Sequence, residues 1–110
     1  METKRNVAAS LRMAEPAELA GDWEVAIGDR GCRVELSPER IESANAYRLG
    51  GGDCLAPALR AAAVGWRPAP DGIELVGADR LTLALFADAG DGGGAATLAG
   101  GAVATIRRHR

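Results

Sequence analysis

Alternation of apolar and polar residues with a period of two dominates the sequence from residue 22 onward, and it restricts the chain to an all-β fold. Two such stretches come first, at residues 22–27 and 32–36. Their apolar members are Trp23, Val25 and Ile27 in the first and Cys32, Val34 and Leu36 in the second. The segment Gly28-Asp29-Arg30-Gly31 separates them, so the sequence predicts a hairpin that begins with a tryptophan.

Further short strands are expected along the rest of the chain, at residues 40–49, 64–68, 73–76, 81–86, 95–98 and 103–107. An alanine-rich stretch at residues 56–63 suits a short helix or a loop packed on a barrel end. The total is about eight strands at spacings of roughly 8 to 12 residues, which is typical of an antiparallel sandwich or a closed barrel. We favour closure, because it removes exposed edges from so small a sheet.

The N-terminal part of the chain differs from the rest. Residues 1–13 are largely polar and show no sustained periodicity, so we expect an extended arm. Residues 14–21 predict a single helical turn, with Pro16 near its start and Gly21 at its end. The opening residues lack the apolar stretch of a signal peptide, and no apolar run approaches the roughly 20 residues that span a bilayer. We therefore expect an arm over residues 1–13 and one β-barrel domain over residues 14–110.

Composition argues against several classes of function. Lys and Arg number 13 against 15 for Asp and Glu, and this formal net charge of −2 disfavours a nucleic-acid partner. The one histidine, His109, lies next to the C-terminus, so the chain cannot supply converging imidazoles for a metal site or a nucleophile–histidine pair. We therefore expect no enzyme activity, no cofactor and no metal ion of its own. Trp23 and Trp66 are interpreted as core residues rather than as ligand-stacking ones.

Two cysteines, Cys32 and Cys54, leave two interpretations open. They are too few for a structural zinc site and are not spaced as Cys-x-x-Cys. In a small domain they form either one disulfide in an oxidising compartment or two buried thiols in the cytosol. Composition favours the disulfide only slightly.

Two motifs stand out beside the cysteine pair. One is Gly65-Trp66-Arg67-Pro68-Ala69-Pro70-Asp71-Gly72-Ile73. The other is Ser10-Leu11-Arg12-Met13, followed by Ala17-Glu18-Leu19-Ala20-Gly21-Asp22-Trp23. In this order, and with one cysteine after the Trp23 strand and one ahead of Gly65, the chain resembles the bacterial serralysin-type metalloprotease inhibitors, also called the alkaline proteinase inhibitor or Inh family. The resemblance covers about residues 9 to 108.

The resemblance implies both a fold and a function. The fold is an eight-stranded antiparallel up-and-down β-barrel of lipocalin-like shape, with a disulfide between Cys32 and Cys54, in a periplasmic and monomeric protein. The function is inhibition of secreted zinc metalloproteases of the serralysin type, whose active-site cleft receives the N-terminal arm. In the family, the free α-amino group at the start of the arm occupies the open coordination position of the protease zinc. Carried over to this sequence, Ala9 or Ser10 provides the amine, and Leu11, Arg12 and Met13 fill the cleft.

The first eight residues depart from the family pattern, because Met1 to Ala8 precede the expected mature terminus. While they are attached, Ala9 has no free α-amine that could bind the zinc. Val7-Ala8-Ala9 resembles a small-residue cleavage site. The extension is therefore either removed, an expression remnant, or a linker such as relatives derived from outer-membrane lipoproteins carry. Two other classes of function stay open: a barrel that binds a small apolar ligand in its mouth, and an envelope structural or adhesion module.

Overall fold

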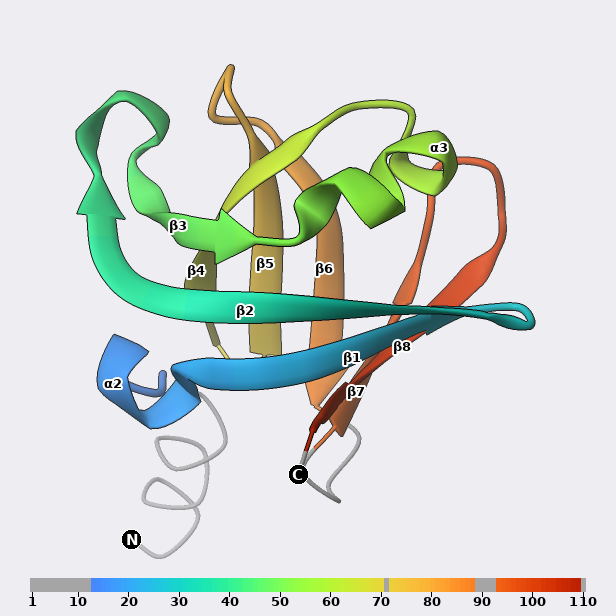
Figure 1. The fold of residues 1–110 in the computed structure, drawn as a ribbon, viewed down its shortest axis with the longest axis horizontal. Coiled ribbons are helices and arrows are strands. Elements are labelled where there is room, and N and C mark those ends of the chain that lie inside the picture. The colour runs from blue at the N-terminus through green and yellow to red at the C-terminus, as the bar shows by residue number, and fades with distance from the viewer. Residues whose placement is uncertain (1–12, 71, 89–92, 110) are drawn as a thin grey trace, which may run out of the picture.

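The computed structural model describes residues 13–70, 72–88 and 93–109. Within these ranges the chain forms eight antiparallel strands that close into one barrel (Figure 1). The strands are β1 (Gly21–Ile27), β2 (Arg30–Ile41), β3 (Ala46–Gly50), β4 (Ala63–Ala69), β5 (Gly72–Gly77), β6 (Thr82–Asp88), β7 (Gly93–Thr97) and β8 (Val103–Arg108). Each strand pairs with the next along the chain, and β1 pairs with β8. The predicted eight-stranded up-and-down barrel is therefore confirmed.

Short helical segments occupy some of the connections. α2 (Pro16–Leu19) precedes β1 and is the single helical turn that the sequence predicts. η1 (Glu42–Ala44) joins β2 to β3, and η2 (Gly52–Leu55) with α3 (Ala56–Leu59) joins β3 to β4. The alanine-rich stretch is thus in part a short helix, drawn above the strands in Figure 1. In the part of the chain that the structure describes, no helix is long and apolar enough to cross a membrane.

The predicted strand over residues 40–49 is wrong in its first half. β2 continues to Ile41 and bends upward near its end in Figure 1, and η1 follows before β3 begins at Ala46. Asn45 has a φ of 53°, a left-handed conformation that no continuous strand allows. The register between β2 and β3 also shifts between Leu36 and Arg40, around Pro38, which has no backbone N–H to donate.

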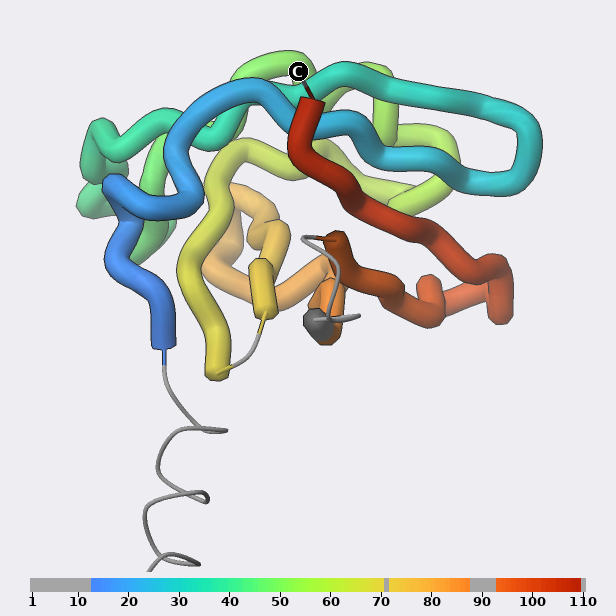
Figure 2. Tube along the Cα trace, turned by 90° about the horizontal axis from the view of Figure 1, so that it is seen from below, coloured from blue at the N-terminus to red at the C-terminus, as the bar shows by residue number. Residues whose placement is uncertain are grey.

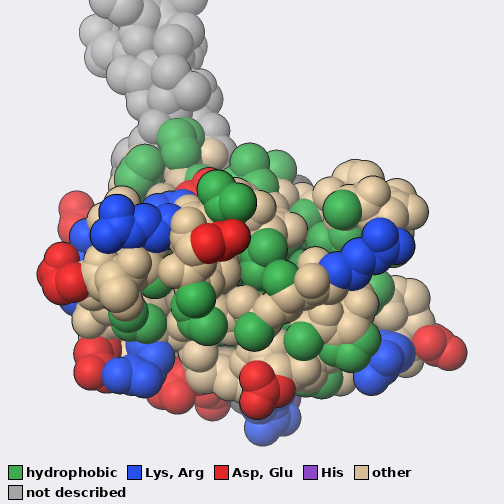
Figure 3. Space-filling view, turned by 90° about the horizontal axis from the view of Figure 1, so that it is seen from above, with side chains coloured by type: hydrophobic (Ala, Val, Ile, Leu, Met, Phe, Trp, Pro, Cys, Tyr) green, Lys and Arg blue, Asp and Glu red, His purple; other side chains and the backbone are tan. Residues whose placement is uncertain are grey.

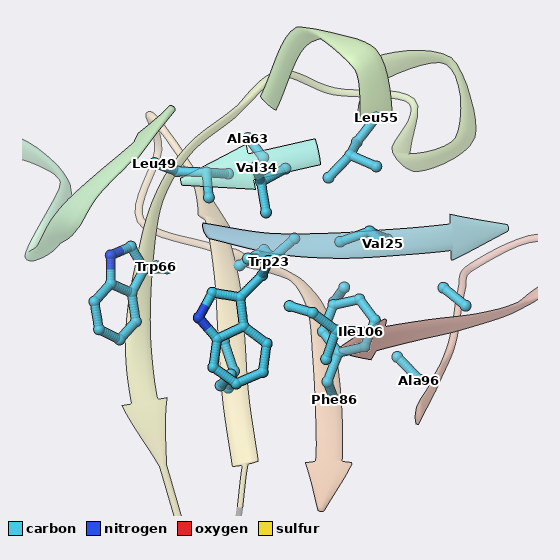
Figure 4. Packing of buried hydrophobic residues seen from close by; sticks show 14 of the residues in the cluster. Trp23, Val25, Val34, Leu49, Leu55, Ala63, Trp66, Phe86, Ala96 and Ile106 are labelled. Carbon is cyan, nitrogen blue, oxygen red and sulfur yellow. The ribbon is translucent and has the colours of Figure 1, made fainter. Parts of the chain in front are cut away.

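The main cluster of apolar side chains packs inside the barrel (Figure 4), and a smaller cluster of Ala44, Ala46 and Val76 is separate from it. All eight strands contribute to the main cluster, and Trp23 and Trp66 are its largest members, with exposures of 4% and 0%. Each indole also has a hydrogen-bond acceptor: Nε1 of Trp23 donates to the carbonyl of Leu19 at 2.8 Å, and Nε1 of Trp66 donates to the carbonyl of Ser37 at 2.9 Å. The prediction that both tryptophans are core residues is confirmed.

A disulfide joins Cys32 on β2 to Cys54 in η2, across 22 residues of sequence. Cys32 is buried in the core cluster, whereas Cys54 is exposed. The bond therefore ties η2 and α3 to the start of β2. This confirms the pairing that the family resemblance implies and settles the choice between a disulfide and two free thiols.

Replacing both cysteines with alanine should lower the free energy of unfolding by about 3 kcal/mol, because the loop between them is then free in the unfolded chain. Urea denaturation followed by tryptophan fluorescence measures this difference. Reductant provides the control, since it should destabilise the parent by a similar amount and leave the double variant unchanged. A double variant as stable as the oxidised parent would contradict this role.

Candidate functional site

The described chain enters the barrel through α2. Ala9, Ser10, Leu11 and Arg12 lie outside the described residues, so the structure does not test their predicted roles. Met13 is the first described residue, and its side chain is 50% exposed. Figure 2 shows the start of the described chain (blue) beside the hairpin of β4 and β5 (yellow), and α2 contacts β2 and β4. The described chain therefore begins on one defined side of the barrel.

α2 consists of a single turn with its own local bonds. Pro16 occupies its start, where a backbone N–H would have no partner within the helix. The backbone N–H of Glu15 donates to Oε1 of Glu18 at 2.9 Å, and the N–H of Glu18 donates to the carbonyl of Glu15 at 2.9 Å. A turn this short is not stable by itself in water. Contacts with the barrel must therefore hold it.

Three consecutive carbonyl groups at the end of α2 accept hydrogen bonds from side chains of the barrel. Arg108, the last residue of β8, donates from Nη2 to Glu18 at 2.8 Å and from Nη1 to Ala20 at 3.2 Å. The carbonyl between them, that of Leu19, accepts the indole N–H of Trp23. The guanidinium carbon of Arg108 also lies 4.6 Å from the centre of the Trp23 ring, within the range of a cation–π contact.

Gly21 lets the chain turn from α2 into β1. Its φ is +130°, a conformation that side chains rarely adopt, and a Cβ there would lie 3.4 Å from Nη1 of Arg108. The side chain of Leu19 packs against the core cluster. α2 is thus fixed on the barrel by its backbone and by an apolar side chain.

The Gly-Trp-Arg-Pro motif has a structural explanation at each of its first three positions. A Cβ on Gly65 would lie 2.9 Å from the Cβ of Ala46, so only glycine lets β3 and β4 approach this closely. Trp66 fills the core and its ring lies 5.5 Å from that of Tyr47. Arg67 links several loops, a role that its spacing in the sequence does not reveal.

Arg67 is the centre of a polar network at one end of β4. Its Nε donates to Oε1 of Glu74 at 2.9 Å, and both side chains are about three-quarters buried, with exposures of 24% and 23%. Its Nη1 and Nη2 donate to the carbonyls of Asn45 and Arg80, both at 3.1 Å. Arg80 in turn donates to the carbonyl of Ser43 at 2.9 Å. Through Arg67 on β4, the network links the loop between β2 and β3 to the loop between β5 and β6.

Replacing Arg67 with alanine should lower the free energy of unfolding by about 2 kcal/mol, because Glu74 and two carbonyls lose a shared donor. Lysine should cost about 1 kcal/mol, since an ammonium keeps the ion pair but lacks the fork that reaches both carbonyls. The matched control is Arg33→Ala, at an exposed position of β2, which should stay within about 0.5 kcal/mol of the parent. Thermal and urea unfolding measure all three, and equal stability for Arg67→Ala and Arg33→Ala would rule out this role.

The other charged groups offer no comparable site. Glu39 and Arg48 form a bidentate pair on β2 and β3, and the hydrogen bond and charge of Arg48 lower the pKa of Glu39 below its usual value. Both side chains are well exposed, so the pair adds little to stability. On the face shown in Figure 3, acidic and basic side chains lie mixed among apolar ones. This face therefore has no electrostatic potential of a single sign.

A small hollow lies beside the disulfide. Its lining residues are Ile27, Arg30, Cys32, Cys54 and Ala58, and its volume is about 30 Å³. That volume is enough for about one water molecule, whereas small-molecule sites usually occupy roughly 300 Å³ or more. The small-ligand alternative therefore finds no support in this hollow.

Comparison with known proteins agrees with the family resemblance. The family model described as protease inhibitor Inh matches residues 13–108. A proteinase inhibitor of Dickeya chrysanthemi is 36% identical over 80 residues, 73% of this chain and 67% of the relative. An alkaline proteinase inhibitor of Serratia marcescens is 37% identical over 91 residues, 83% of this chain and 73% of the relative. One of Yersinia ruckeri is 32% identical over 96 residues, 84% of this chain and 77% of the relative.

A solved structure supports the fold. The crystal structure of a psychrophilic marine protease MP inhibitor superposes with a TM-score of 0.75 and 23% sequence identity, covering 87% of this chain and all of that one. At this identity the likeness concerns the barrel and not the target. The family match and the curated relatives together show that the chain belongs to the protease inhibitor Inh family.

Proposed function

We propose that the chain inhibits secreted zinc metalloproteases of the serralysin type by inserting its N-terminal arm into the active-site cleft. The observation that carries the proposal is the fixed base of the arm. The chain enters the barrel through α2, and the carbonyls of Glu18, Leu19 and Ala20 at the end of α2 accept hydrogen bonds from Arg108 and Trp23. Fixing one end of a binding segment reduces the entropy that binding must remove. The relatives named alkaline proteinase inhibitors support the same class of function.

The chemistry of the target explains how an arm can inhibit it. A catalytic zinc site has three protein ligands and one open position that holds the nucleophilic water. An α-amino group in that position displaces the water and blocks the reaction. The amine binds only in its neutral form, and because its ordinary pKa is about 8, coordination readily drives off its proton near neutral pH.

In this proposal each residue of the arm has a position in the cleft. Ala9 or Ser10 presents the α-amine to the protease zinc, and Leu11, Arg12 and Met13 occupy the adjoining substrate sites. The exposure of the Met13 side chain on the isolated chain leaves it free to contact a protease. Residues 1–13 then form the inhibitory arm and residues 14–110 the barrel that presents it.

The proposal requires that residues 1–8 be removed, since they place eight residues between the amine of Met1 and that of Ala9. A retained extension leaves only backbone carbonyls to approach the zinc, and these bind it more weakly than an amine. We place the mature protein in the periplasm, as a monomer without cofactor. The Cys32–Cys54 disulfide is consistent with that oxidising compartment.

Titration of a serralysin-type protease with the form that begins at Ser10 tests the proposal. Peptidase activity should fall in proportion to added inhibitor until the two are equimolar. A serine protease of the subtilisin type provides the control, because it has no catalytic zinc and should keep full activity. Inhibition of both enzymes, or of neither, would contradict the proposed target class.

A further inference from the structure

We propose that Arg108 is the positioning residue of the arm: it holds α2 against the barrel so that the chain before Met13 leaves in one direction. This inference rests on the proposed function, because it assigns a role in inhibition to a residue outside the arm. Arg108 contributes through α2 and needs no contact with the protease.

Arg108 is separated from its two acceptors, Glu18 and Ala20, by 90 and 88 residues of sequence, so its side chain joins the two ends of the described chain. The planar guanidinium presents donors in a fixed fork, and here two of its nitrogens reach carbonyls two residues apart on one turn. The Trp23 ring below it, 4.6 Å from the guanidinium carbon, limits where that fork can lie.

Apart from Arg108, the side chain of Leu19 and the indole of Trp23 hold α2 against the barrel. The four residues of α2 include none that is buried, and the apolar contact is made by the half-buried Leu19. Without Arg108, the hydrogen bond from Trp23 still binds the carbonyl of Leu19, but the two bonds to the carbonyls on either side of it are lost. The turn and the arm attached to it then sample more orientations before binding.

The positioning role of Arg108 is separable from the stability of the barrel. The two bonds of Arg108 are exposed to solvent, where a hydrogen bond adds little to the free energy of unfolding. β8 remains joined to β1 and β7 by its own backbone pairs, whatever side chain position 108 carries. A substitution there should thus affect the direction of the arm more than the barrel.

The experiment compares Arg108→Ala, Arg108→Lys and the matched control Arg33→Ala in the form that begins at Ser10. We expect inhibition constants for a serralysin-type protease that are raised about tenfold, about threefold and less than about twofold, respectively. Lysine keeps a positive charge over Trp23 but cannot bond both carbonyls at once. The melting temperatures of all three variants should stay close to that of the parent.

Hydrogen exchange in the free inhibitor distinguishes positioning from direct contact with the protease. In Arg108→Ala, the indole N–H of Trp23 and the backbone N–H of Ala20 should exchange faster, whereas the indole N–H of Trp66 should not change. Unchanged inhibition with faster exchange would overturn the inference, and so would weaker inhibition with unchanged exchange. If deleting the arm from the unsubstituted inhibitor leaves its inhibition constant unchanged, the proposed function fails and this inference fails with it. That outcome is measured on the unsubstituted protein, so it is distinguishable from a failure of the Arg108 inference alone.

Discussion

A form of the chain that begins at Ser10 should inhibit a serralysin-type protease about 100-fold more tightly than the form that begins at Met1, a difference of about 2.8 kcal/mol in binding free energy. In the proposed mechanism only the trimmed form brings a free amine to the zinc. A form that begins at Ala9 should be similarly potent if Ala9 supplies that amine. Inhibition constants measured side by side for these lengths give the comparison.

A third length completes the series. A chain that begins at Ala14 lacks the whole arm and should lose most of its inhibition, while its circular dichroism and melting temperature stay those of the parent. The barrel should be unaffected because every member of the described core lies at or after Leu19. Equal potency for the long, trimmed and armless forms would reject the mechanism in which the α-amine of the arm binds the protease zinc.

Replacing Trp66 with alanine should lower the free energy of unfolding by about 3 to 5 kcal/mol, because the side chain is fully buried and its removal leaves a cavity. The loss also leaves the carbonyl of Ser37 without its indole donor. Urea denaturation followed by circular dichroism measures the change.

Trp66→Phe is the matched control, since it keeps most of the apolar volume and should cost less than alanine. At temperatures where each variant is folded, inhibition should match that of the parent. A Trp66→Ala protein that melted like the parent but no longer inhibited would instead place Trp66 in the protease contact.

The period of two in the sequence predicted most strands but not always their inward faces. Over residues 81–86, Leu81, Leu83 and Leu85 alternate with Thr82, Ala84 and Phe86, and hydrophobicity alone does not choose between the two sets. In the structure Ala84 and Phe86 are buried while Leu85 is exposed. The pairing with β5 decides this, because it places Ala84 opposite Leu75 and Phe86 opposite Ile73, both of which are buried.

The polar networks could not be predicted from the sequence, for a physical reason. Arg67 and Arg108 donate mainly to backbone carbonyls, and every residue has a carbonyl, so no side-chain pattern marks the acceptors. Glu74, a carboxylate partner of Arg67, becomes its neighbour only through the register of β4 and β5. The break at Asn45 was missed for a similar reason, since a single left-handed residue leaves little trace in the alternation.

The candidate site was reached by family resemblance rather than by residue chemistry. Ser10, Leu11, Arg12 and Met13 include no group that by itself indicates a protease target, and the chemical agent in the proposal is a chain terminus, which no side-chain motif records. What the structure adds is the base of the arm, in the carbonyls of Glu18 to Ala20 and their bonds to Arg108 and Trp23.

Acetylation of the α-amine at the start of the arm tests whether that free amine is the group that inhibits the protease. Lys4 is the only lysine in the sequence, so in the form that begins at Ser10 an amine-selective acetyl donor has the α-amine as its one target amine. The mechanism predicts that acetylation raises the inhibition constant of this form by about 100-fold and leaves its fold unchanged. An acetylated form that inhibits as tightly as the unmodified one would contradict the claim.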